Sequence, residues 1–476
     1  MNYKKITSYL GNILIIEGLL LVFPVLISLF TRDKIAKSFL VTIALLIAVG
    51  FACIKIKPDK SAIYAKEGCF IVGVAWILMS AFGALPFYLS GYIPSYIDAF
   101  FETVSGFTTT GSTILTDVEA LPKSLLFWRS FTHFIGGMGI LVFIIAIMPK
   151  TEGSSMHIMR AEVPGPTVGK LVSKIGLTAR ILYGIYFGMT VIMAILLYVG
   201  GMPLFDSVVN AFATAGTGGF GILNEGISGY NSVYCEMVIA VFMMLFGVNF
   251  NLYYLLGKRQ IKRAVKNEEL WWYLGIIAIA TLLIAAVLFA KSETAFDSFR
   301  LAFFQVTSII STTGFATADF NGWPLVTRMI LFCLMFVGGM VGSTGGGLKV
   351  NRIIIIVKNS FRSVKKAMNP RVVDTVKIDN QTVEEPIVSG VSAYVCAFSI
   401  ILLFSAIVVS LDGHTFQETI SGVVTCITNV GPGFGVCGPC GSFASFSPLS
   451  KAVLSFDMLA GRLELVPILM LFTSKK

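Results

Sequence analysis

The stretch Ser105-Gly-Phe-Thr-Thr-Thr-Gly-Ser-Thr113 recurs in altered form three more times along this 476-residue chain. The other copies read Phe212-Ala-Thr-Ala-Gly-Thr-Gly-Gly-Phe220, Ser308-Ile-Ile-Ser-Thr-Thr-Gly-Phe-Ala316 and Thr425-Cys-Ile-Thr-Asn-Val-Gly-Pro-Gly433. Their central glycines are separated by roughly 100 residues each time. That period is too long for a solenoid, so it predicts one larger structural unit present four times.

The composition indicates a chain that is mostly within a membrane. Hydrophobic residues make up 55% and charged residues 13%, whereas soluble domains carry about a quarter charged residues. The apolar residues gather in blocks near the roughly 20 residues that a spanning helix needs. Ten such blocks fall at 10–30, 37–56, 69–91, 127–148, 179–200, 232–257, 270–290, 326–357, 388–411 and 451–473.

The net charge of +10 does not indicate nucleic-acid binding, because the basic residues gather between the apolar blocks. Lys258–Lys266 and Lys349–Arg371 are two of these clusters, and the chain ends in Lys475-Lys476. Clusters of this kind mark cytoplasmic loops. With an even number of spans, both termini are expected on the cytoplasmic side of a multi-pass protein in the cytoplasmic membrane.

Each of the four stretches lies between two apolar blocks, after an amphipathic run too short to span. The pattern predicts an all-α polytopic membrane protein in which two N-terminal helices precede four span–pore-loop–span repeats around a pseudo-four-fold pore. Irregular backbone at membrane depth is tolerated only where protein buries it or where it lines a water-filled cavity. The expected divisions are an extension at 1–60 and repeats at 61–150, 151–258, 259–370 (with a gating loop) and 371–476.

The residue types in these loops suit a dehydrated cation. Backbone carbonyls replace the water shell of an ion when they face inward together, and glycine permits the necessary dihedral angles. Ordinary turns or small-residue helix packing would explain a single such loop, but four favour a pore. The predicted ion-binding residues are Thr109, Thr110 and Gly111; Gly216, Thr217 and Gly218; Thr312, Thr313 and Gly314; and Asn429, Val430 and Gly431.

A gate is expected below the filter, where glycines interrupt the second span of repeat three. Each glycine weakens a helix interior by roughly 1 kcal/mol, so Gly338, Gly342, Gly345, Gly346 and Gly347 predict an unwound segment. Close helix packing through small residues is the alternative. Arg462, about eleven residues into the last span, is a second gate candidate, or a structural arginine paired with Asp457 or Glu464. Lys349 and Arg129 are weaker candidates that could lie near span ends and reach the interface.

Several motifs together resemble the Trk/Ktr/HKT superfamily of potassium transporters, and within it the TrkH type. They are Phe82-Gly-Ala-Leu-Pro86, Asp98-Ala-Phe-Phe-Glu102, Trp128-Arg129, Gly136-Gly-Met-Gly139, Ala161-Glu-Val-Pro-Gly-Pro166, Gly342-Ser-Thr-Gly-Gly-Gly-Leu-Lys349, Asn429-Val-Gly-Pro-Gly433 and Gly461-Arg-Leu-Glu464. The resemblance implies potassium uptake, a homodimer, an intramembrane gating loop at 338–347 and a cytosolic TrkA-like nucleotide-binding regulatory subunit. It also implies ion sites at the residues before each filter glycine, with a glycine at all four positions favouring potassium over sodium.

No enzyme is indicated. Cys437-Gly-Pro-Cys440 has thioredoxin-like spacing, but no βαβ pattern surrounds it, so a local disulfide or two free thiols are the expected alternatives. The three histidines form no metal-ligand pattern, and no nucleotide-binding loop follows a strand. The only expected ion is the transported K⁺, with no covalently bound cofactor and no nucleic-acid partner. Sodium- or proton-coupled symport and a less selective monovalent cation channel remain as alternatives.

Overall fold

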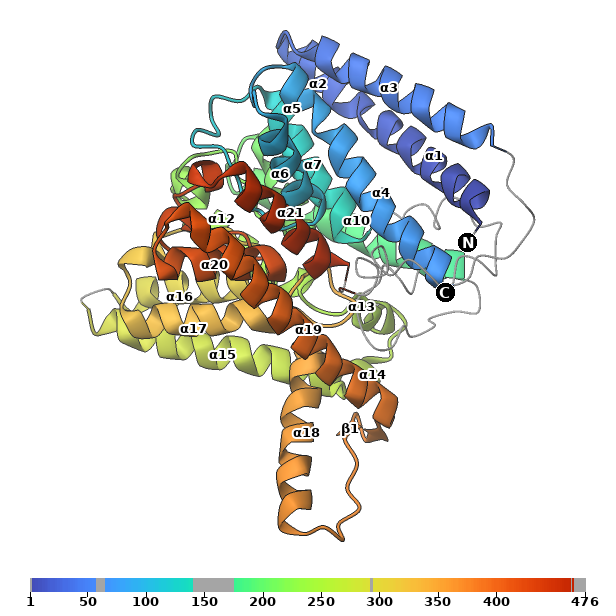
Figure 1. The fold of residues 1–476 in the computed structure, drawn as a ribbon. Coiled ribbons are helices and arrows are strands. Elements are labelled where there is room, and N and C mark those ends of the chain that lie inside the picture. Colours follow the sequence, from blue (N-terminus) through green and yellow to red (C-terminus); the bar gives the residue numbers. More distant parts are fainter. Residues whose placement is uncertain (1, 57–64, 140–174, 292–293, 464, 466–476) are drawn as a thin grey trace.

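The structure, a computed structural model, describes residues 2–56, 65–139, 175–291, 294–463 and 465. Helices make up most of these residues, and several are long and apolar enough to cross a bilayer (Figure 1). Within the described ranges six helices meet that criterion, or seven if one sharply bent pair is counted as a span. The predicted all-α polytopic class is confirmed.

The two leading apolar blocks form a helical hairpin at one edge of the molecule. A first span of 29 residues consists of α1 (Tyr3–Leu20) and α2 (Val22–Thr31), and it returns as α3 (Ala36–Ile54). Gly11 and Gly50 let α1 and α3 approach closely, since a Cβ on Gly11 would lie 2.7 Å from the carbonyl oxygen of Gly50. In Figure 1 this hairpin lies side by side with α4.

Each of the four repeats contributes a long first helix, a short second helix and a third helix. Their first helices are α4 (Ala65–Gly83), extended by α5 (Leu85–Leu89), then α10 (Ile175–Val199), α15 (Glu268–Phe289) and α19 (Glu385–Val409). The short second helices are α6 (Tyr96–Phe107), α11 (Leu204–Ala215), α16 (Ala295–Ile310) and α20 (Phe416–Thr428). These four confirm the half-helix expected before each Thr/Gly-rich loop.

Capping residues fix where the short helices begin. Ser95 and Thr294 accept hydrogen bonds from the backbone N–H three residues on, and Thr415 forms a reciprocal capping box with Glu418. In repeat two, Pro203 precedes the first helical residue. Because all four helices end in the recurring stretches, their carboxyl ends lead directly into the four loops.

The third helices are shorter than the apolar blocks predicted. They are α7 (Lys123–Gly137), α12 (Val233–Phe246) with α13 (Phe250–Gly257), α17 (Leu325–Val337) with α18 (Val350–Met368), and α21 (Pro448–Arg462). The axes of α12 and α13 differ by 93°. The prediction of a continuous second span in repeat two is therefore wrong, whereas the predicted interruption of the second span of repeat three is present. The remainders of blocks 127–148 and 451–473 lie largely outside the described residues.

The basic cluster at 349–371 forms a helix rather than the predicted loop. Helix α18 projects from the bundle as an arm (Figure 1). The chain then returns alongside it to the hairpin of β1 (Lys377–Ile378) and β2 (Gln381–Thr382), which lies near the bundle. Short helices complete the fold: α14 (Ile261–Val265), η1 (Gly226–Tyr230), η2 (Phe320–Gly322), η3 (Ser410–Asp412), η4 (Gly435–Cys437) and η5 (Phe443–Ser445).

Candidate functional site

All four short helices end with the same backbone turn. One residue in each loop has a left-handed conformation although it is not glycine: Thr109 (φ +56°), Thr217 (+55°), Thr312 (+59°) and Asn429 (+57°). The residue after it donates its N–H five residues back, with Thr110, Gly218, Thr313 and Val430 bonding to Ser105, Ala213, Ser308 and Thr425, each at 2.9 Å. These are the bonds of a Schellman motif. The four loops are therefore equivalent residue by residue.

This equivalence corrects the predicted register of the second loop. The glycines two residues after the left-handed residue are Gly111, Gly219, Gly314 and Gly431, and all four have positive φ. The sequence pattern of the four stretches predicts Gly218 in this position. Loop two contains adjacent glycines, and only the backbone shows that Thr217, Gly218 and Gly219 match Thr109, Thr110 and Gly111.

The four glycines close a ring. A Cβ on Gly111 would overlap the carbonyl oxygen of Gly218, one on Gly219 would overlap that of Thr313, and one on Gly314 would overlap that of Val430. The ring closes at Gly431, where a Cβ would lie 2.7 Å from the carbonyl oxygen of Thr110. Each loop thus packs its glycine against the preceding carbonyl of the next loop. The structure brings together the four loops that the sequence predicted to converge.

Side chains add cross-links at the junction of loops four and one. The Asn429 amide donates to the Thr110 hydroxyl oxygen (2.9 Å) and to the carbonyl of Met458 (2.9 Å). The Ser112 hydroxyl donates to the carbonyl of Gly431 (3.1 Å). Asn429 stands where the other three loops have threonine, and its longer side chain reaches across to loop one. The predicted ring members other than the glycines are fully buried.

Gly216, one of the predicted ion-binding residues, lies outside the ring of four glycines. It is the residue after α11, and a Cβ there would come within 3.0 Å of the Cβ of His133 on α7. His133 itself was not predicted to have a role. Its Nδ1 lies 2.7 Å from the carbonyl oxygen of Gly106, and its Nε2 accepts the N–H of Phe220 at 3.3 Å. The imidazole of His133 therefore holds the end of α6, which precedes loop one, and the backbone of loop two.

Arg129 is buried rather than near a span end, so the expectation that it reaches the interface is wrong. Its guanidinium pairs with Glu102 at 2.8 Å, with both side chains at most 1% exposed. It also lies over the ring of Phe220, 4.0 Å from the centroid, and donates to the carbonyl of Gly221 (3.2 Å). Glu102 in turn accepts the N–H of Ile114 (3.0 Å). This buried pair ties the outer ends of loops one and two together.

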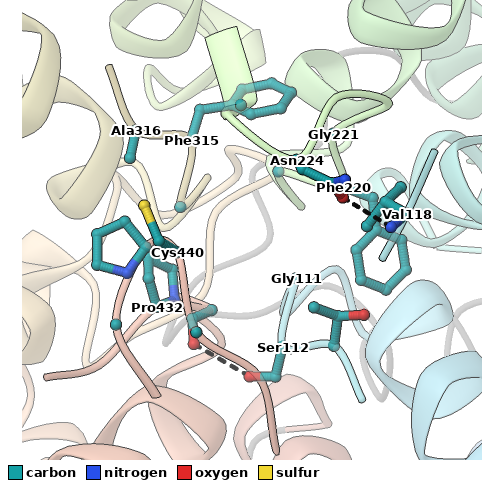
Figure 2. A pocket seen from close by; sticks show the side chains of 18 of the residues that line it. Gly111, Ser112, Val118, Phe220, Gly221, Asn224, Phe315, Ala316, Pro432 and Cys440 are labelled. Carbon is teal, nitrogen blue, oxygen red and sulfur yellow. Dashed lines mark hydrogen bonds between the residues drawn. The ribbon is translucent and has the colours of Figure 1, made fainter. Parts of the chain in front are cut away.

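Beyond the glycine ring, the loops enclose a polar cavity of about 200 Å³ that receives residues from all four repeats (Figure 2). Glu225 and Asp319 are the acidic residues in its lining. Nearby, the amide of Asn224 holds the pKa of Asp117 below its ordinary value. Arg129 also lines the cavity but is paired with Glu102, so the net charge of the lining is negative, which concentrates cations.

Cys440 also lines this cavity, and its sulfur points into it in Figure 2. Burial and the charges of Asp319 and Glu225 raise the pKa of its thiol. All eight cysteines are free, so of the two alternatives for Cys437 and Cys440 the structure has the free thiols. Cys437 is the last residue of the single-turn helix η4 and Cys440 follows it, and the described residues contain no sheet of the thioredoxin kind.

On the other side of the ring, the glycine-rich segment 338–349 passes beneath loops three and four. A Cβ on Gly345 would lie 2.8 Å from the carbonyl oxygen of Ser311, and one on Gly346 would lie 2.7 Å from that of Thr428. The N–H of Gly346 donates to the Thr312 hydroxyl oxygen at 2.6 Å. Gly338, Gly342 and Gly347 all have positive φ. The predicted interruption is present, and it contacts the ring directly.

Two basic side chains hold this segment. Lys349, the residue before α18, is 1% exposed and donates to the carbonyl of Gly345 (2.5 Å), so the expectation that it reaches the interface is wrong. Arg462 donates to the carbonyl of Thr344 (2.7 Å) and to the carbonyls of Gly136 and Gly137 (2.6 Å each). Asp457, one of the partners considered for Arg462, instead accepts a hydrogen bond from Ser405 (2.8 Å). The other, Glu464, lies outside the described residues.

Comparisons with known proteins point to one family. The TrkH family, described as cation transport protein, matches residues 32–476. The chain is 34% identical to the Trk system potassium uptake protein TrkH of Salmonella typhimurium and to that of Escherichia coli K12, over 99% of each chain. It is 30% identical to TrkG of Escherichia coli K12 over 99% of this chain and 98% of that one. These relatives are transport proteins, in agreement with the prediction that the chain is not an enzyme.

The comparison with solved structures points to the same family. The crystal structure of the potassium transporter TrkH from Vibrio parahaemolyticus matches with a TM-score of 0.90 and 30% identity, over 99% of both chains. Both the sequence match and the structural match extend over almost the whole chain, so the likeness is not confined to the loops.

The Glu102–Arg129 pair generates a stability prediction. Glu102→Gln leaves a buried guanidinium without its counter-charge, a change that costs about 3–5 kcal/mol. We therefore expect a clearly lower unfolding temperature for the purified protein in detergent. The matched control is Glu385→Gln, which breaks the surface pair with Arg362 and should cost less than about 1 kcal/mol. Equal effects of the two substitutions would contradict the role assigned to the buried pair.

Proposed function

The chain belongs to the TrkH family of cation transport proteins, and from this membership we propose that it takes up potassium across the cytoplasmic membrane through the ring of four loops. The observation that carries the proposal is the closure of that ring, in which each glycine lies against a carbonyl of the next loop. The relatives named as potassium uptake proteins support the choice of ion.

The chemistry of the ring suits a monovalent cation. Backbone carbonyls and threonine hydroxyls replace a hydration shell without adding a fixed negative charge. Around the ring these oxygens come from Thr109-Thr110-Gly111, Thr217-Gly218-Gly219, Thr312-Thr313-Gly314 and Asn429-Val430-Gly431. Four helix carboxyl ends also face the loops, and each carries a partial negative charge of about half an elementary charge. Together they favour a cation at the centre.

We propose segment 338–349, with Arg462, as the gate. The segment lies against the base of loops three and four, and Arg462 joins it to the end of α7 on the opposite side of the pore. Lys349 and Arg462 place two positive charges beside the path below the ring. Like charges repel a permeating cation at short range, so transport requires these groups to move away from the axis.

The expected partners and orientation belong to the same proposal. The basic clusters, of which α18 carries one, indicate that this side of the molecule faces the cytoplasm. Phe361, Val364 and Met368 on α18 are between 59% and 83% exposed, and this apolar face suits a second copy of the chain in a homodimer. The adjacent basic residues would then be available to a TrkA-like regulatory subunit. Such a subunit would supply the nucleotide control.

Ion flux in proteoliposomes tests the filter. We expect potassium and rubidium to permeate far better than sodium, and Gly111→Ser to bring the potassium-to-sodium ratio toward one, because the new Cβ displaces the carbonyl of Gly218. The matched control is Gly91→Ser, since Gly91 has the same positive φ but no atom within 4 Å of a new Cβ. Equal permeation of sodium and potassium in the unchanged protein would refute the selective filter. Flux against a potassium gradient that depends on sodium or protons would instead indicate coupled symport.

The gate generates a separate prediction. Arg462→Gln removes hydrogen bonds of a charged donor to Thr344, Gly136 and Gly137, and each such bond contributes about 1.5–3 kcal/mol. Loss of one such hydrogen bond is enough to shift the equilibrium between the closed and open states about tenfold toward the open state. We therefore expect a comparable rise in rubidium flux. Arg362→Gln, which affects a surface pair on α18, is the control, and unchanged flux in Arg462→Gln would remove this residue from the gate.

A further inference from the structure

A second polar cavity, of about 360 Å³, lies against the proposed gate segment, and none of the ring residues lines it. It forms where the α12–α13 bend, the start of α15, the start of α18 and the β hairpin meet. Among its lining residues are Asn249, Glu269, Val341, Asn351, Asp379 and Glu384. Three of these carry carboxylates, and among the described residues no lysine or arginine lines the cavity. This is notable because α18, which forms one wall, is otherwise basic.

Glu269 is the central residue of this cavity. It is 3% exposed, and its Oε1 accepts the N–H of Val341 (2.8 Å) in the gate segment and that of Asn351 (3.2 Å) in the first turn of α18. Within the described part of the chain no donor reaches its other oxygen, Oε2. The side-chain oxygen of Asn351 is also buried without a hydrogen-bond partner. The cavity therefore holds a carboxylate oxygen and an amide oxygen that both lack a donor.

The other carboxylates of the lining differ in what they already bind. Asp379 accepts the N–H of Glu268 (2.6 Å) and the amide of Asn267 (3.1 Å), so hydrogen bonds from the chain occupy both of its oxygens. Glu384 is exposed to the cavity mouth and accepts no hydrogen bond from the described residues. Glu269 and Glu384 are thus the two carboxylates that remain available to a ligand.

The lining offers oxygen ligands and no basic side chain, a set that suits a cation. The charge of Lys349 reaches Glu269 from outside the lining, where the ammonium donates to the carbonyl of Gly345. No three acidic, histidine or cysteine side chains in the described ranges come close enough together to ligate one ion directly, which disfavours an all-protein cage. Mg²⁺ dehydrates reluctantly and is usually held through one or two carboxylates while it keeps several waters. We propose that this cavity binds one hydrated divalent cation of the Mg²⁺ class between Glu269, Glu384 and Asn351.

Binding at this place would act on the gate. The same carboxylate that faces the ion holds Val341 and the start of α18 through Oε1, so an ion on Oε2 braces Glu269 in the position that fixes the segment. Occupancy therefore favours the arrangement in which the segment lies beneath the ring. The binding half of this inference is independent of the proposed function, whereas the effect on flux rests on it.

Binding is tested on the full-length protein in detergent with Mn²⁺ as a paramagnetic probe and Mg²⁺ as competitor. We expect one saturable site, and a dissociation constant about tenfold higher in Glu384→Gln and in Glu269→Gln. The second variant keeps an oxygen that can accept the two N–H groups, so the segment retains its contact. Glu385→Gln is the matched control, since that neighbouring carboxylate pairs with Arg362 and does not line the cavity.

Non-saturable Mn²⁺ binding, equal weakening by Glu384→Gln and Glu385→Gln, or binding of spermidine in place of Mn²⁺ would each overturn the site. In proteoliposomes, Mg²⁺ on the face that carries α18 should slow rubidium flux at least twofold in the unchanged protein and not in Glu384→Gln. Saturable binding without any effect on flux would overturn the link to the gate and leave the site. A loss of potassium selectivity would contradict the proposed filter and would not affect the proposed cation site.

Discussion

The contact between each ring glycine and the carbonyl of the next loop is the constraint on which the rest of the structure depends. At Gly111, Gly219 and Gly314 there is no room for a Cβ, and the positive φ at each disfavours other residues as well. Because the contacts run from loop one to two, three, four and back, no loop can shift without disturbing its neighbour. The half-helices, their caps and the third helices are arranged so that four separate chain segments reach this one ring.

The ring is held in a backbone conformation that costs free energy. Threonine in the left-handed region is disfavoured by roughly 1–2 kcal/mol, and three of the four loops have threonine there. The cost is offset by the Schellman hydrogen bonds at each helix end and by supports such as His133 behind loops one and two. At the fourth position asparagine tolerates this conformation better, and its amide joins loops one and four. Strain that recurs at four equivalent positions is consistent with a functional role for these residues.

Much of this arrangement could be predicted from the sequence, and the failures have physical causes. Threonine and glycine spacing identified the loops, and the short amphipathic runs identified the half-helices. The register of loop two failed because Gly218 and Gly219 are adjacent, and only hydrogen bonding distinguishes them. His133 and Arg129 were missed as supports because their partners lie between 27 and 92 residues away. The 93° bend between α12 and α13 was hidden within one apolar block, since hydropathy does not record direction.

The assembly of the ring from one chain has an evolutionary consequence. In a pore built from four identical subunits, one mutation alters all four quarters at once, whereas here a codon change alters a single quarter. Loop four has asparagine and valine where loop one has two threonines, and loop two has glycine at the position that threonine occupies in loops one and three. Such a ring can drift one quadrant at a time, with the remaining three quadrants preserving its shape. The four quarters of such a ring can therefore differ in the oxygens that they present, which is impossible in a ring of identical subunits.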